Sequence, residues 1–91
     1  MLSKLPFEIE NNEDLDKQIA RLGLIAELDA INLYEQLASK TRSSLLKKVL
    51  LEIAKEEKTH VGEFLEVLLR LDAEQVEELE RGRDEVEEKE G

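Results

Sequence analysis

The chain has 91 residues, no cysteine and a formal charge of −10, with 23 acidic residues against 13 basic ones. The lack of cysteine excludes disulfides, thiolate zinc sites and iron–sulfur clusters, which leaves carboxylates and imidazole as the strong metal ligands. The acidic balance excludes a nucleic-acid partner, because phosphate binding requires clustered Lys and Arg. No apolar run is long enough for a membrane span or a signal peptide, so we expect a cytoplasmic protein without a membrane partner.

Two long helices and a short third one are the elements that the sequence predicts. An all-α fold of one domain is expected over residues 1–91, because only one proline and four glycines interrupt the chain. Apolar residues recur every three or four positions over 13–39 and again over 43–71. The polar residues between these ranges indicate a tight turn, so an antiparallel hairpin is expected. A strongly acidic third helix is expected over 73–88, capped by Asp72.

Two polar residues interrupt the apolar stripe of the second predicted helix. Glu57 and His60 form an E-x-x-H pair, which places a carboxylate above an imidazole on one helical face. Ile53 and Phe64 belong to the same face on either side of the pair. Because a buried carboxylate is costly without a compensating charge, a cation is expected beside Glu57.

The first predicted helix offers a matching carboxylate, Glu27, on a face of small and apolar residues. Glu27 and Glu57 each lie about 15 residues from the centre of the turn, or roughly 22 Å along the helix axis. The two carboxylates are therefore expected to be level across the hairpin. Ferritin-like di-iron bundles use one Glu from each of two helices and a Glu-x-x-His pair from each of the other two. Two copies of this chain, related by a two-fold axis, are expected to complete such a four-helix bundle.

The expected site holds two iron ions per dimer. Glu57 is expected to bridge the ions, with Glu27 as a terminal carboxylate ligand and His60 as a nitrogen ligand. Two ions about 3.5–4 Å apart can each give one electron to O2 and so reduce it by two electrons, whereas a single ion gives only one. Tyr34, two turns from Glu27, is a candidate to hydrogen-bond a ligand or to supply an electron. The alternative for Tyr34 is an ordinary core residue with its hydroxyl at the surface.

These residues resemble those of the encapsulated ferritins, whose chains have two long helices and a short third one. The resemblance rests on Glu27, Tyr34 and the Glu57-x-x-His60 pair, and it covers most of the chain. It implies a ferroxidase centre between two chains that oxidises Fe(II) to Fe(III) with O2. It also implies a decamer built as a ring of five dimers, inside an encapsulin nanocompartment whose shell stores the iron.

The chain departs from the family pattern near the expected metal site. The family has metal-entry carboxylates at the positions that Ala26 and Asp29 occupy here, so Asp29 is the expected entry ligand. An aromatic residue often found beside the tyrosine is Leu33 in this chain. The chain ends Glu-Lys-Glu-Gly without an obvious shell-addressing tail. We therefore expect a truncated chain or a domain that is normally fused to the shell protein.

Two other functions remain open from the sequence. A rubrerythrin-like peroxidase would use a similar bundle to reduce hydrogen peroxide, although the cysteine-bound electron-transfer iron of such proteins has no ligands here. A metal-free helical dimerisation module would need only the apolar stripes. In that case Glu57 and His60 would be an exposed polar pair.

Overall fold

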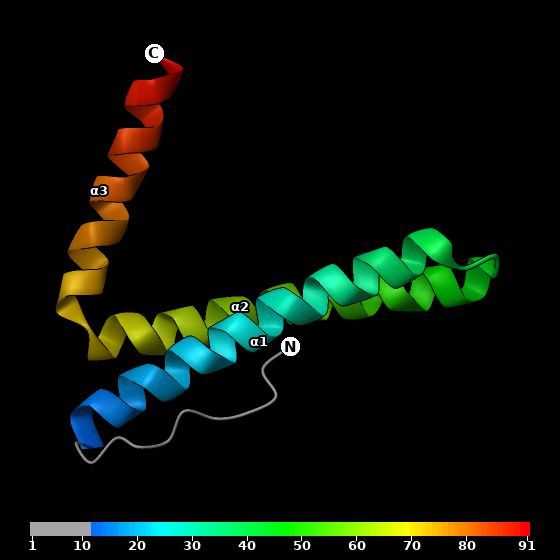
Figure 1. Cartoon of the computed structure of the whole chain (residues 1–91), viewed down its shortest axis with the longest axis horizontal. Helices are drawn as coiled ribbons and strands as arrows, with labels where there is room; N and C mark the ends of the chain where they lie inside the picture. Colours follow the sequence, from blue (N-terminus) through cyan, green and yellow to red (C-terminus); the bar gives the residue numbers. More distant parts are fainter. Residues whose placement is uncertain (1–11) are drawn as a thin grey trace.

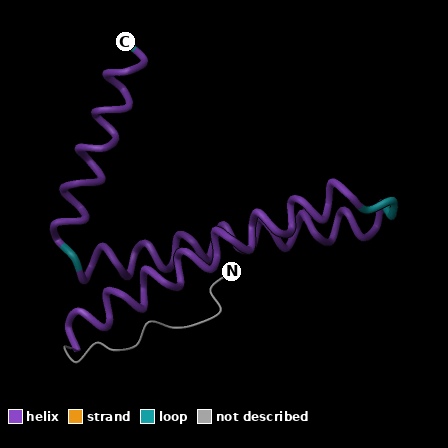
Figure 2. Tube along the Cα trace, in the orientation of Figure 1, coloured by secondary structure: helices purple, strands orange, loops and turns teal. Residues whose placement is uncertain are grey.

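A computed structural model describes residues 12–91, which form three helices (Figures 1 and 2). The helices are α1 (Asn12–Lys40), α2 (Ser44–Leu71) and α3 (Ala73–Glu90). α1 and α2 lie side by side as an antiparallel hairpin, and α3 leaves the end of the hairpin that is opposite its turn. The all-α prediction is confirmed for the described residues. None of their helices is both long enough and apolar enough to cross a membrane.

Hydroxyl side chains form the turn between α1 and α2. The Oγ of Ser43 accepts a hydrogen bond of 3.0 Å from the amide of Leu46, which makes Ser43 the N-cap of α2. The Oγ1 of Thr41 accepts a hydrogen bond of 3.2 Å from the amide of Ser43. Helix α2 therefore begins one residue later than its expected start at 43, because the capping residue stays outside the helix.

A single residue, Asp72, joins α2 to α3. Its backbone is extended, with φ −137° and ψ 92°. Its Oδ1 accepts a hydrogen bond of 3.3 Å from the amide of Gln75, and its Oδ2 lies 3.0 Å from a guanidinium nitrogen of Arg21 on α1. Asp72 thus ends one helix, caps the next and ties both to the first.

The hairpin buries few side chains. The apolar residues that are at most 9% exposed are Ala20, Ile31, Ala38, Ala54 and Leu68. Large apolar side chains such as Leu45 and Val67 are 72% and 50% exposed. The radius of gyration is 16.6 Å, whereas a compact domain of this length would have about 12 Å. The chain alone therefore leaves open the kind of apolar surface that protein association covers.

Helix α3 stands apart from the hairpin. None of its residues, all of which are described, is buried, and its apolar side chains Val76, Leu79 and Val86 are 39%, 42% and 58% exposed. It ends at Glu90, two residues beyond the expected end at 88, and the amide of Gly91 closes its last turn on the carbonyl of Glu87. Its charged residues pair along the helix, as Arg83 and Glu87 do at 3.4 Å.

Candidate metal centre

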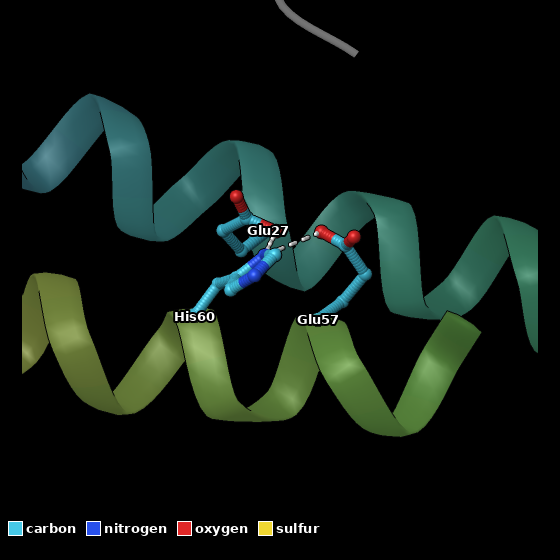
Figure 3. A group of neighbouring side chains, drawn as sticks. All are labelled: Glu27, Glu57 and His60. Atoms are coloured by element: carbon cyan, nitrogen blue, oxygen red, sulfur yellow. Dashed lines mark ion pairs between the residues drawn. The ribbon is translucent and has the colours of Figure 1, made fainter. Parts of the chain in front are cut away.

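Three of the residues expected at a metal site meet near the middle of the hairpin. Figure 3 shows Glu27 reaching from α1 toward Glu57 and His60 of α2. Because α1 and α2 run antiparallel from one turn, residues at similar distances from that turn lie level with each other. The helical spacing of Glu57 and His60 then turns both side chains toward α1.

The imidazole of His60 lies between the two carboxylates (Figure 3). Its Nδ1 is 3.4 Å from the Oε2 of Glu27 and 3.5 Å from the Oε2 of Glu57. One ligand atom from each of the three residues lies within 4.8 Å of the others. Both carboxylate side chains are 19% exposed, whereas the side chain of His60 is 44% exposed. The group is therefore closed on the side of the hairpin and open at the imidazole.

One oxygen of this group lacks a hydrogen-bond partner. The Oε2 of Glu27 is buried, and none of the described residues makes a hydrogen bond to it. A buried carboxylate oxygen without a partner is unfavourable by about 1–3 kcal/mol or more, and a second carboxylate nearby adds repulsion. A cation among the three side chains would compensate both effects. Two carboxylates and an imidazole are also a donor set that iron accepts, so the residues fit a ferrous ion.

Two other residues expected at the site lie outside this group. Asp29 is two positions from Glu27, about 200° around the helix, and it lines a separate hollow with Asn32, Leu33 and Gln36. Tyr34 is half-buried and lies about 10 Å along α1 from Glu27. A metal-entry role for Asp29 and a redox role for Tyr34 stay predictions.

The sequence did not indicate a hollow of about 370 Å³ beside the group. It is lined by His60, Glu63, Phe64 and Val67. The last three lie three, four and seven residues after His60 on α2, so all four share one face of that helix. That spacing groups the four side chains, but it does not show that the space beside them is open.

Comparisons with known proteins identify the family of this chain. The family model described as EncFtn-like matches residues 5–82. The chain is 51% identical to a ferritin-like–encapsulin shell fusion protein of Pyrococcus furiosus, over an alignment of 92 positions that covers 97% of this chain. It is 44% identical over 55 residues, which are 60% of its own length, to the encapsulin nanocompartment cargo protein EncC of Myxococcus xanthus. The matched regions span 27% and 42% of these two relatives.

A solved structure extends the likeness to the fold. The crystal structure of the encapsulated ferritin domain from Pyrococcus furiosus superposes with a TM-score of 0.84 at 49% identity. The match covers 97% of this chain and 94% of that one, so all three helices have counterparts. The fold is ferritin-like, and the chain belongs to the EncFtn-like family, the encapsulated ferritins.

Proposed function

We propose that this chain is a ferroxidase, which oxidises Fe(II) to Fe(III) with O2 at a di-iron centre shared by two copies. The observation that carries the proposal is the convergence of Glu27, Glu57 and His60, in which the buried Oε2 of Glu27 makes no hydrogen bond with the described residues. Membership of the encapsulated ferritins supports iron as the metal. Iron is the substrate here, and the protein binds and orients it.

Each chain supplies half of the ligands that a ferritin-like di-iron bundle uses. The open side of the group, at His60, is where a second copy would bring its own three residues. Four carboxylates from two copies carry a charge of about −4, which two ferrous ions neutralise. This balance supports one iron per chain, and the proposal that two copies share both ions rests on the half set of ligands that each chain supplies.

Each of the three ligands has its own role in the proposal. We propose that Glu57 bridges the two irons, and that Glu27 and His60 are terminal ligands. Two bound ferrous ions together supply the two electrons that one O2 molecule accepts. Asp29 would bind iron on its way to the centre, and Tyr34 would hydrogen-bond a ligand or donate an electron.

The proposed assembly is a homodimer within a decamer of five dimers, housed in an encapsulin nanocompartment that stores the oxidised iron. The two relatives support the encapsulin partner, because one is a fusion with an encapsulin shell protein and the other is an encapsulin cargo protein. The exposed apolar residues of the hairpin support association of several copies.

Anaerobic addition of Fe(II), followed by native mass measurement and iron analysis, tests the stoichiometry. The expected result is one iron per chain and a shift to a dimer or a multiple of it. Admission of O2 should then produce Fe(III), followed by its absorbance. The pair of substitutions Glu57→Ala and His60→Ala should abolish both binding and oxidation, whereas Glu56→Ala, which removes an exposed neighbouring carboxylate, should leave them unchanged.

Two additional measurements, oxidation by hydrogen peroxide and thermal unfolding, separate the two alternative functions. Rapid oxidation by hydrogen peroxide with negligible oxidation by O2 would indicate a rubrerythrin-like peroxidase. An oligomer that is the same with and without Fe(II), together with an unchanged or higher melting temperature in the Glu57→Ala and His60→Ala variant, would indicate a metal-free dimerisation module.

A further inference from the structure

Helices α1 and α2 approach each other closely where Gly23 faces Phe64. A Cβ atom added to Gly23 would lie 2.6 Å from Cδ1 and 2.7 Å from Cζ of the Phe64 ring, and it would also contact Cε1. Real Cβ atoms essentially never come within 3.0 Å of another heavy atom in this way. The ring therefore occupies the space that the missing side chain of Gly23 leaves.

This contact lies one helical turn from the metal-binding group. Gly23 precedes Glu27 by four residues on α1, and Phe64 follows His60 by four residues on α2. In an antiparallel hairpin these steps run in the same direction, so the two contacts lie at neighbouring levels, about 6 Å apart along the axis. The connecting turn is roughly 22 Å away from the ligands, which makes Gly23 and Phe64 a much nearer constraint.

We propose that Gly23 and Phe64 are positioning residues, whose contact sets the separation of α1 and α2 at the metal centre. This inference rests on the proposed function. Two ligands, Glu57 and His60, belong to α2 and keep their mutual geometry when the helices move apart. Glu27 belongs to α1, so its distance to the other two depends on the helix separation.

The hollow beside His60 could accept the Phe64 ring if a side chain at position 23 displaced it. Phe64 lines that hollow of about 370 Å³ together with His60, Glu63 and Val67. An alanine at position 23 would move the helices apart or push the ring toward the imidazole. Both responses change the arrangement of the ligand atoms that now lie within 4.8 Å of one another. Metal affinity depends on such supporting contacts, and their loss typically costs about 10–100-fold.

Another glycine of the hairpin provides a matched control. Gly62 lies on α2, two residues from His60, and a Cβ added there would meet nothing within 4 Å. Alanine is also the better helix former at such a position. Gly62→Ala therefore makes the same chemical change as Gly23→Ala, in the same hairpin, without the contact with Phe64.

The test titrates the full chain and its variants with Co(II), a probe with visible absorption bands that does not require O2. Gly23→Ala should raise the apparent dissociation constant about tenfold or more. Gly62→Ala should change it by less than about twofold. In the metal-free protein, thermal unfolding should occur at a lower temperature for Gly23→Ala and at a higher one for Gly62→Ala.

A second substitution tests whether the ring is the cause. Phe64→Leu shortens the side chain that an added Cβ would strike, so Gly23→Ala combined with Phe64→Leu should bind Co(II) more tightly than Gly23→Ala alone. Such non-additivity is expected only of residues in contact. If Gly23→Ala fails to fold, the double variant is compared with Phe64→Leu, and it should bind at least as tightly.

The outcomes separate this inference from the proposed function. Equal affinities for Gly23→Ala and Gly62→Ala, or a loss that Phe64→Leu does not reverse, would overturn the positioning role and leave the ferroxidase proposal standing. A wild-type chain that binds no Co(II) or Fe(II) would overturn both. Reduced thermal stability of Gly23→Ala in that case would show a contact that only holds the fold together.

Discussion

The middle of the hairpin and helix α3 use similar residues to different ends. Both carry carboxylates close to a nitrogen-containing side chain. Those of α3 are exposed and pair with Arg side chains along the helix, as Glu87 does with Arg83. In the hairpin, Glu27 and Glu57 come from two different helices and are 19% exposed. Packing of one helix on another therefore turns acidic residues into a candidate metal site, because it removes water and brings together groups that lie far apart in the sequence.

The largest difference between the two regions should appear in their contributions to stability. Leu68→Ala in the hairpin core, where the side chain is 3% exposed, should lower the free energy of unfolding by about 2–5 kcal/mol. Leu79→Ala on α3, where the side chain is 42% exposed, should lower it by less than about 1 kcal/mol. Urea unfolding of the metal-free variants, all at the same protein concentration, measures both losses. Equal losses would mean that α3 is buried by another chain in solution.

The oxygen of Glu27 that lacks a hydrogen bond predicts a substitution with opposite effects in the presence and absence of metal. Glu27→Gln should raise the free energy of unfolding of the metal-free protein by about 1 kcal/mol, because it removes the negative charge from a carboxylate whose buried Oε2 makes no hydrogen bond and which lies near a second carboxylate. Metal at 100 times the dissociation constant of the wild-type site should stabilise the wild-type protein by about 2.7 kcal/mol. The same metal concentration should stabilise the Glu27→Gln variant less, because the variant has lost a ligand.

Thermal unfolding with and without Co(II) tests this reversal. Glu87→Gln on α3 is its control, because the carboxylate there is exposed and should show no dependence on metal. A Glu27→Gln protein that is less stable without metal would mean that the carboxylate is satisfied in solution, contrary to the contacts of the single chain.

The junction between the regions should depend on the cap that Asp72 provides. Asp72→Ala should cost about 1 kcal/mol and fray the start of α3, because it removes both the acceptor for the Gln75 amide and the partner of Arg21. Asp72→Asn keeps the capping oxygen and removes the charge, so α3 should stay helical. Hydrogen exchange at the amide of Gln75 distinguishes the two variants, and equal protection in both would show that the cap does not hold this end of α3.

The smallest effect is expected on the exposed flank of the hairpin. Lys58 and Glu35 join α2 to α1 at 3.4 Å, but their side chains are 60% and 48% exposed. Lys58→Ala should therefore change the free energy of unfolding by less than about 0.5 kcal/mol, and less still at high salt. A larger loss that persists in 1 M salt would mean that this pair is buried when copies associate.

The helices and the cluster of Glu27, Glu57 and His60 could be predicted because they depend on short-range periodicity and on the length of the hairpin. Equal distances from one turn suffice to place Glu27 opposite Glu57 and His60. The Gly23–Phe64 contact and the hollow beside His60 depend on how the two helices are rotated against each other, which periodicity does not determine. The separate position of Asp29 follows from helical geometry alone, because a step of two residues turns a side chain to another face.

The direction of α3 could not be predicted either, since it depends on the backbone angles of one residue and on the distant Arg21. Asp72 is the only residue between α2 and α3, so no flexible linker separates the two helices. One residue more or less at this point would turn α3 by about 100° about its own axis and present a different row of acids to its surroundings. The length of this connection therefore determines which face of α3 is available for contact with other chains.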